Sequence, residues 1–280
     1  TGDLLLVAGK GHEKTQDYGK RKLFFSDQKV IMHSIKLKNK SLSKDLKLNI
    51  IGEQSKSKIL KTLSIKKISI NSKMIKKNDV FFAIKGKKID GNRFVSEALK
   101  KKSCLAIVNR KNINYPKSKQ IKVDNTLNFL TKCSSIFREN INAKIISITG
   151  SCGKTTLKEM IGLTLKRLSK TTYSPKSFNN KYGVPLSLFN LKQNDEFGVF
   201  EVGMDKKGEI DYLTKIIKPD LGVITNISYA HSKNFKNINQ IAEAKAEIIN
   251  NISNSGTLIL NMEDNFYQYH KNLARNKKLK

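Results

Sequence analysis

Residues 145–156 read IISITGSCGKTT, which is a β-branched run, a glycine-punctuated turn and the start of a helix. Gly150 and Gly153 allow the backbone to curl, so that successive N–H groups face an anion at the helix N-terminus. In such a loop Lys154 reaches the terminal phosphates of a nucleotide, and the Thr155 hydroxyl binds Mg²⁺. The stretch therefore predicts a nucleotide-binding loop made of Thr149, Gly150, Ser151, Cys152, Gly153, Lys154, Thr155 and Thr156.

Strands and helices alternate around this loop. We expect strands at 144–149, 197–203, 221–226 and 257–261, and helices at 154–169, 183–190, 208–217 and 238–251. Upstream, buried-strand runs at 79–84 and 104–108 flank a helix candidate at 94–101, and a further helix is expected at 126–140. Alternation at this spacing predicts an α/β fold with open parallel sheets covered on both faces.

The composition also suggests where the chain divides. Residues 1–36 hold a strand candidate at 3–7, a glycine loop and a helix candidate that starts near Ser26. Residues 37–47, rich in Lys, Ser, Asn and Leu, form a junction. We expect a small α/β domain at 48–140 and a P-loop domain with a parallel sheet at 141–280, incomplete at its end, where a Lys-rich tail follows the last strand.

The formal charge of +31 raises the possibility of nucleic-acid binding. The basic residues are mostly lysines spread along the whole chain, whereas bidentate recognition of bases and phosphates favours arginine. This pattern favours a background of solvated lysines and no specific nucleic-acid partner. A lysine-rich nucleic-acid-binding protein remains the alternative.

Other features of the composition point to a reducing compartment. Cys104, Cys133 and Cys152 are widely spaced and form no CxxC pair, which argues against a disulfide framework or a zinc site. No apolar run approaches the roughly 18 to 20 residues of a membrane-spanning helix. We therefore expect a cytoplasmic protein without a transmembrane segment. The missing initiating Met suggests that a longer polypeptide has been cut.

The loop departs from the standard P-loop, because Ile148 stands where that pattern has its first glycine. Its shorter TGxxGKTT form resembles the Mur ligases and folylpolyglutamate synthetases, which use ATP to join a carboxylate to an amino group. Further segments resemble the central domain of the MurF members of the Mur ligase family. They are SFNNKYGVP at 177–185, FEVGM at 200–204, TN at 225–226, AH at 230–231 and AEAKAEI at 242–248.

Upstream segments resemble the MurF N-terminal domain, which holds the UDP end of the substrate. They are NSK at 71–73, DVFFAIKG at 79–86 and DGNRF at 90–94. The family usually has Asp-Ser-Arg where this chain has Asn71, Ser72 and Lys73, which leaves the nucleotide contacts at that point open. The resemblance implies substrate-binding roles for Ser72, Lys85, Gly86, Asp90, Gly91 and Asn179.

The resemblance also implies the residues that carry the chemistry. Glu201, His231 and Lys245 would bind Mg²⁺ together with Thr155, and Lys154, Lys245 and His231 would be catalytic. Lys245 matches a lysine that becomes a carbamate, and only an uncharged amine takes up CO₂, so its pKa must be lowered. Asn179 and Asn180 would line the region of the ATP phosphates and the acyl acceptor, and Asn226 would lie near the nucleotide.

Each of these residues also has a plainer interpretation. Glu201 would be an ordinary strand-end carboxylate and His231 a loop histidine. Lys245 would be a solvated lysine on a helix. Asn179 and Asn180 would cap or turn the chain, and Asn226 would close its strand.

The first residues resemble a different branch of the same family. The loop GKGHE at 9–13 and its flanks resemble the end of the MurE ligases. There Gly9 and Glu13 would contact the far end of an incoming diamino acid. The chain is thus expected to be a slice of a MurE–MurF fusion, in which part of a Rossmann-like ligase C-terminal domain precedes two MurF domains.

The resemblance implies an ATP-dependent ligase that adds D-alanyl-D-alanine to UDP-N-acetylmuramoyl-tripeptide through an acyl phosphate, with ATP and Mg²⁺ as cofactors. A MurF C-terminal ligase domain would follow in the full-length chain. The alternatives are a MurE-like or folylpolyglutamate-type ligase and a fragment without turnover.

Overall fold

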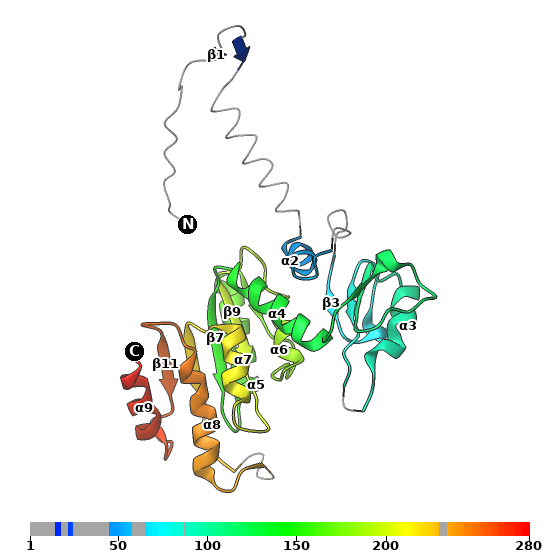
Figure 1. Ribbon diagram of the computed structural model, residues 1–280. Coiled ribbons are helices and arrows are strands. Elements are labelled where there is room, and N and C mark those ends of the chain that lie inside the picture. The colour runs from blue at the N-terminus through cyan, green and yellow to red at the C-terminus, as the bar shows by residue number, and fades with distance from the viewer. Residues whose placement is uncertain (1–14, 18–21, 25–44, 58–64, 87, 230–233) are drawn as a thin grey trace.

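The computed structural model describes residues 15–17, 22–24, 45–57, 65–86, 88–229 and 234–280 (Figure 1). Its larger sheet has five parallel strands in the order β11-β10-β7-β9-β8. They are β7 (Lys144–Thr149), β8 (Thr171–Tyr173), β9 (Phe197–Glu201), β10 (Leu221–Ile224) and β11 (Thr257–Leu260). Ile148 of the central strand β7 is in register with Glu201 of β9 and Val223 of β10. The carboxyl ends of β7, β9 and β10 therefore meet at one edge of the sheet.

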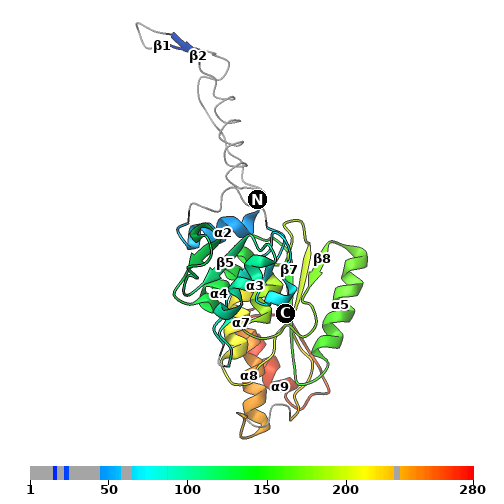
Figure 2. The same ribbon diagram turned by 90° about the vertical axis from the view of Figure 1, so that its right-hand side faces the viewer.

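Helices cover both faces of this sheet (Figure 2). On one face α5 (Lys154–Leu168) packs Leu157, Ile161 and Leu165 against buried β-branched side chains of the strands. The other face is covered by α6 (Gly183–Leu188), α7 (Glu209–Ile217) and α8 (Ile238–Asn250). The expected parallel sheet with helices on both faces is thus confirmed.

A smaller sheet of four parallel strands precedes it, in the order β3-β4-β5-β6. The strands are β3 (Ile68–Ser69), β4 (Val80–Phe82), β5 (Leu105–Val108) and β6 (Gln120–Lys122). Its helical elements are η2 (Ser72–Met74), η3 (Gly91–Phe94), α3 (Val95–Lys100) and η4 (Lys117–Lys119). α3 buries Val95, Ala98 and Leu99 against one face of this sheet.

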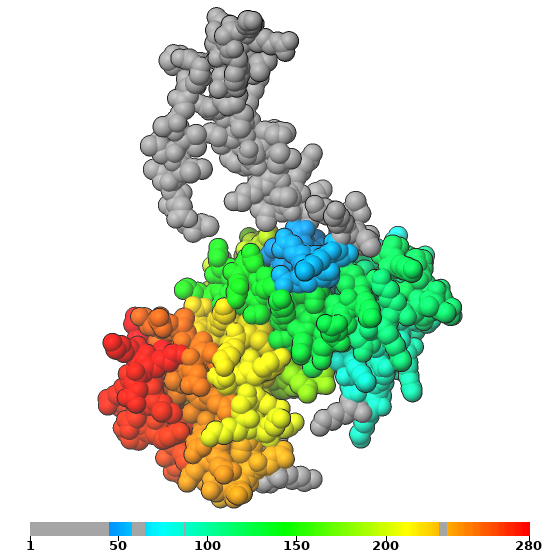
Figure 3. All heavy atoms as spheres, in the orientation of Figure 1, coloured from blue at the N-terminus to red at the C-terminus, as the bar shows by residue number. Residues whose placement is uncertain are grey.

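One helix, α4 (Thr126–Glu139), joins the two sheets. At its start the Thr126 hydroxyl donates to the carbonyl of Ala83, just after β4, at 3.0 Å. Near its end the Phe137 ring lies 5.3 Å from that of Phe189, beyond α6. A single cluster of buried side chains runs from the small sheet across α4 to the large one. On the outside α2 (Leu46–Gln54) packs against α4 and forms a distinct patch of the surface (Figure 3).

The strands and helices expected from the sequence between residues 79 and 261 are confirmed, with ends that shift by at most two residues. The short strands β3, β6 and β8 and the helix α2 were not expected. The expectation that only a Lys-rich tail follows the last strand was wrong, because residues 267–276 form α9 (Tyr267–Asn276). This helix buries His270 and Ala274, four residues apart, and packs against α8 and β11.

Much of the first 44 residues lies outside the described part of the chain, including the strand candidate at 3–7, the loop at 9–13 and the helix candidate after Ser26. In the described part of these residues, β1 (Thr15–Asp17) pairs antiparallel with β2 (Lys22–Phe24). In the described ranges, no helix has the length and apolar character needed to cross a membrane.

Candidate nucleotide-binding site

The loop between β7 and α5 depends on its two glycines. Gly150 has a φ of +146°, and a Cβ at this position would lie 1.8 Å from Thr225 Oγ1. Gly153 has a φ of +78° and is the left-handed N-cap of α5. Both positions favour glycine, the first for space and conformation and the second for conformation alone. The chain can therefore turn sharply from the strand into the helix.

The segment after β10 holds this loop in place. The Ser151 N–H donates to the Asn226 carbonyl at 2.9 Å, and the Cys152 N–H donates to Asn226 Oδ1 at 3.0 Å. In return the Thr225 hydroxyl donates to the Cys152 carbonyl at 2.6 Å. Asp264, beyond β11, accepts a hydrogen bond from the Ile227 N–H at 2.6 Å. Asn226 thus shapes the glycine loop directly.

Lys154 lies across the opening of the loop. Its Nζ donates to the carbonyls of Gly150 at 2.8 Å and Ser151 at 3.1 Å. These bonds curl the side chain back over its own loop and hold the positive charge there. Thr156, two residues after Lys154, is exposed on the first turn of α5.

Glu201 ends β9 and is only 1% exposed. Its Oε2 accepts a hydrogen bond from the Thr155 hydroxyl at 2.7 Å, and its Oε1 accepts one from Asn179 Nδ2 at 2.7 Å. Both donors are neutral, and no ion pair joins Glu201 to a cation in the described ranges. A buried carboxylate is costly without a positive partner. Glu201 is therefore a buried strand-end carboxylate held by two neutral donors.

Lys245 on α8 is 2% exposed, so the interpretation as a solvated lysine is wrong. Burial, reinforced by repulsion from Lys154 and partly opposed by Cys152, lowers the pKa of Lys245 to about 7. Of the described residues, none accepts a hydrogen bond from its amine. Lys154 and Cys152, which act on this amine, both belong to the glycine loop. A substantial fraction of it is uncharged near neutral pH.

The neighbouring asparagines differ in what they contact. The Asn179 amide holds Glu201, whereas Asn180 Oδ1 accepts hydrogen bonds from the N–H groups of Tyr182 and Gly183, each at 3.0 Å. Asn180 therefore turns the chain into α6, as the plainer interpretation predicted. His231 lies outside the described residues.

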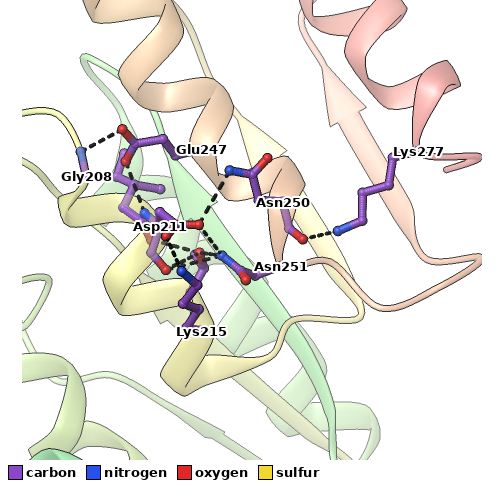
Figure 4. A network of polar contacts seen from close by, with 9 residues as sticks. Gly208, Asp211, Lys215, Glu247, Asn250, Asn251 and Lys277 are labelled. Atoms are coloured by element: carbon purple, nitrogen blue, oxygen red, sulfur yellow. Dashed lines mark hydrogen bonds and ion pairs between the residues drawn. The ribbon is translucent and has the colours of Figure 1, made fainter.

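A cavity of about 800 Å³ opens beside Lys154 and Asn179 and extends to the first turn of α7. Glu247 of α8 fixes that turn, because its carboxylate accepts from the N–H groups of Gly208 at 2.6 Å and Asp211 at 3.1 Å (Figure 4). Sequence reasoning did not single out Glu247, although it belongs to the AEAKAEI segment. The only signal in the sequence was an acidic residue two positions after Lys245. The residue that Glu247 binds, Gly208, lies 39 positions away in the sequence.

The predicted substrate-binding residues of the small sheet form a turn after β4. Lys85 and Asp90 form an antiparallel bridge, and the N–H groups of Gly86 and Gly91 donate to the carbonyls of Ile89 and Ile84. A Cβ at Gly91 would lie 2.6 Å from the Ile84 carbonyl oxygen, which restricts this position to glycine.

Two carboxylates, Asp90 and Glu97, anchor this region. The Asp90 carboxylate accepts hydrogen bonds from Asn92, which lower the pKa of Asp90, and pairs with Arg110 at 3.1 Å. The Ser72 hydroxyl donates to Glu97 of α3 at 2.7 Å. The structure thus brings Lys85, Gly86, Asp90 and Gly91 together, whereas Ser72 contacts α3.

Two family models match the chain, one over the small sheet and one from the glycine loop onwards. The model described as Mur ligase family, catalytic domain, matches residues 64–138, and the Mur ligase middle domain matches residues 148–280. The chain belongs to the Mur ligase family. Neither match extends over residues 1–36, whose resemblance to the MurE ligases stays a prediction.

Relatives within the Mur ligase family agree with the MurF resemblance. The UDP-N-acetylmuramoyl-tripeptide–D-alanyl-D-alanine ligase of Buchnera aphidicola subsp. Acyrthosiphon pisum (strain APS) is 39% identical over 214 residues, which are 76% of this chain and 47% of that protein. A crystal structure of MurF from Acinetobacter baumannii matches with a TM-score of 0.75 and 32% identity, over 82% of this chain and 51% of that one.

MurF from Thermotoga maritima in complex with ADP matches with a TM-score of 0.66 and 32% identity, over 75% of this chain and 48% of that one. The fold is therefore that of the MurF ligases. The chain spans about half the length of the relatives that it matches.

Proposed function

We propose that this chain forms the UDP-substrate-binding and ATP-binding parts of a ligase that adds D-alanyl-D-alanine to UDP-N-acetylmuramoyl-tripeptide. One observation carries the proposal: the buried Glu201 carboxylate, bonded to Thr155 at the first turn of α5, lies beside the glycine loop and forms no ion pair with any residue that the structure describes. The names of the relatives supply the substrates, and the MurF structure with ADP supports a nucleotide at this loop.

In this proposal the terminal phosphates of ATP lie against the glycine loop and the N-terminus of α5. The γ-phosphoryl group passes to the terminal carboxylate of the tripeptide, which yields ADP and an acyl phosphate. The amine of D-alanyl-D-alanine then attacks the acyl carbon, a peptide bond forms, and phosphate leaves. Lys154 supplies positive charge where negative charge spreads over the transferred group.

The residues present suit Mg²⁺. Glu201 and Thr155 offer oxygen ligands, and Mg²⁺ is commonly held by one or two carboxylates and the phosphates of its substrate. Among the described residues, no group of three or more His, Cys, Asp or Glu side chains is placed to hold a metal ion. When bound, Mg²⁺ would neutralise the phosphate charge.

Lys245 would extend this site as a carbamate, because its amine is buried, has a pKa of about 7 and is repelled by Lys154 of the glycine loop. His231 is proposed as a further ligand on the resemblance alone. Asn179 would orient Glu201, and Asn226 would keep the loop open for the nucleotide.

The small sheet would bind the UDP end of the substrate through the turn at Lys85, Gly86, Asp90 and Gly91, and through Ser72. Gly9 and Glu13 stay proposed contacts of a MurE-like segment. We also propose that the protein acts in the cytoplasm and that a C-terminal ligase domain completes the site.

Equilibrium binding tests the proposal directly. The chain is titrated with UDP-N-acetylmuramoyl-tripeptide and, as a control, with a GDP-linked sugar. We expect saturable binding of the first only, and weaker binding by Asp90→Ala, which loosens the turn after β4. Equal affinity for both nucleotides, or none for the tripeptide, would contradict the substrate assignment. Ligation is then assayed by the mass of the pentapeptide product in a full-length MurF-type protein that carries these residues.

A further inference from the structure

Lys158 is a fully buried cation that the proposed chemistry does not use. It lies on α5, one turn after Lys154 and Thr155, and its side chain is 0% exposed. In the described part of this lysine-rich chain, the buried lysines are Lys158 and Lys245. Burial of an ammonium is costly unless hydrogen bonds and an opposite charge replace its water.

The contacts of Lys158 provide that compensation. Its Nζ donates to the carbonyls of Ser174 at 2.8 Å and Lys176 at 2.6 Å, and it pairs with Glu159 Oε1 at 2.7 Å. An ammonium has three donors, and these three acceptors use all of them. Two of the three bonds go to the backbone of one short segment, so Lys158 fixes the path of that segment.

Residues 174–179, here called the β8–α6 segment, leave the edge strand β8 and lead towards α6. Within it Lys176 has a left-handed φ of +48°, a conformation that costs energy for a residue other than glycine. The hydrogen bond from Lys158 to the Lys176 carbonyl holds this turn. The segment ends with Ser177, 3.4 Å from the Thr155 hydroxyl, and with Asn179, which holds Glu201.

Lys158 therefore lies directly beneath the segment that presents Asn179 to Glu201. α5 contributes two residues to this arrangement, because Thr155 bonds the other oxygen of the same carboxylate. Loss of Lys158 would remove the two hydrogen bonds that hold the backbone of the β8–α6 segment to α5. Asn179 would then no longer be held where it fixes the carboxylate.

We propose that Lys158 is a positioning residue for the MgATP site: by holding the β8–α6 segment against α5, it keeps Asn179 and Thr155 on the two oxygens of Glu201. The inference rests on the proposed function, because the oriented carboxylate matters only where a metal and phosphates bind. Lys158 itself does not touch the nucleotide in this proposal.

The test compares Lys158→Met with Leu165→Ala on the same helix. Leu165 lies two turns further along α5 and packs against the sheet, so its variant measures the effect of a loosened α5 without removal of the Lys158 hydrogen bonds. ATP is titrated calorimetrically with and without Mg²⁺, and unfolding is followed in parallel. We expect Lys158→Met to weaken MgATP binding at least about tenfold, the effect of losing hydrogen bonds from a charged group, and to change binding of ATP without Mg²⁺ much less.

Leu165→Ala should lower the stability of the fold and leave unchanged the increase in ATP affinity that Mg²⁺ gives. If Lys158→Met folds and binds MgATP as Leu165→Ala does, the proposal is wrong. If Lys158→Met does not fold, Lys158→Gln replaces it, because its amide still reaches one of the two carbonyls. For Lys158→Gln we expect faster hydrogen exchange at residues 176–179 and weaker MgATP binding. Unchanged exchange and unchanged affinity would overturn the proposal. Failure of the unmodified chain to bind MgATP would instead refute the proposed function.

Discussion

The Thr155 hydroxyl lies 2.7 Å from Glu201 Oε2, although the two residues are 46 positions apart in the sequence. One belongs to the first turn of α5 and the other ends β9, the neighbour of β7 in the sheet. The parallel arrangement brings the glycine loop and the acidic strand end to the same edge. The site therefore follows from the order of the strands.

Replacement of the carboxylate by an amide tests whether Glu201 binds the metal. Glu201→Gln keeps the size of the side chain and removes a buried charge that has no ion pair among the described residues, so stability without Mg²⁺ should not fall. The increase in ATP affinity that Mg²⁺ gives should largely disappear. Calorimetric titration with and without Mg²⁺ measures both. An undiminished Mg²⁺ effect in this variant would exclude Glu201 as a ligand.

Lys245 should form a carbamate in a pH-dependent way. Because the pKa of Lys245 is lowered to about 7, its reactive neutral form increases as the pH rises through 7. A carbamate signal from carbon-13 bicarbonate, followed by NMR, should grow over that range and be absent in Lys245→Ala. Lys207 is the matched control, since its hydrogen bond to Glu243 raises the pKa of Lys207. A signal that survives in Lys245→Ala and vanishes in Lys207→Ala would reverse the assignment.

The two glycines of the loop should respond differently to alanine. In Gly153→Ala the added Cβ has no atom within 4 Å. The only cost to stability is the left-handed conformation, about 1–2 kcal/mol. Gly150→Ala must also displace Thr225, which holds the Cys152 carbonyl, so it should lose more stability and most ATP affinity. Urea unfolding and ATP titration of both variants provide the comparison. Equal losses would show that the close approach to Thr225 is unimportant.

Arg138 should stabilise the junction between α4 and the large sheet. Its guanidinium is buried and donates to the carbonyls of Ile217, Ile141 and Lys218. Arg138→Met leaves these acceptors without partners and should cost about 3 kcal/mol or more in urea unfolding. Arg110→Met removes an exposed pair with Asp90 and should cost at most ~1 kcal/mol. Similar losses for both would contradict this account.

The loop and most of the large sheet could be predicted because their signals are local. A β-branched run, two glycines and a lysine specify a strand, a turn and a helix start within residues 145–156. The strand β8 has only three residues and depends on pairing with β9, so nothing in its own sequence specifies it. α9 has a polar composition, and it becomes a helix by burying His270 and Ala274 against its neighbours.

The environments of the charged residues could not be predicted, because tertiary packing sets them. Lys245 stands in a sequence of alanines and glutamates that is typical of a solvated helix, yet α8 is covered by the sheet and by α9. Lys158 differs from the many other lysines only through acceptors that lie 16 and 18 residues away. The pairing of Asn179 with Glu201 likewise required the order of strands.

The central claim is that the glycine loop binds the phosphates of MgATP. The most direct measurement is a calorimetric titration of the unmodified chain and of Lys154→Ala with ATP in the presence of Mg²⁺. The account predicts saturable binding at one site in the unmodified chain, and a loss of at least about tenfold in affinity for Lys154→Ala with the fold intact. Equal affinity in the two proteins, or no binding by the unmodified chain, would contradict it.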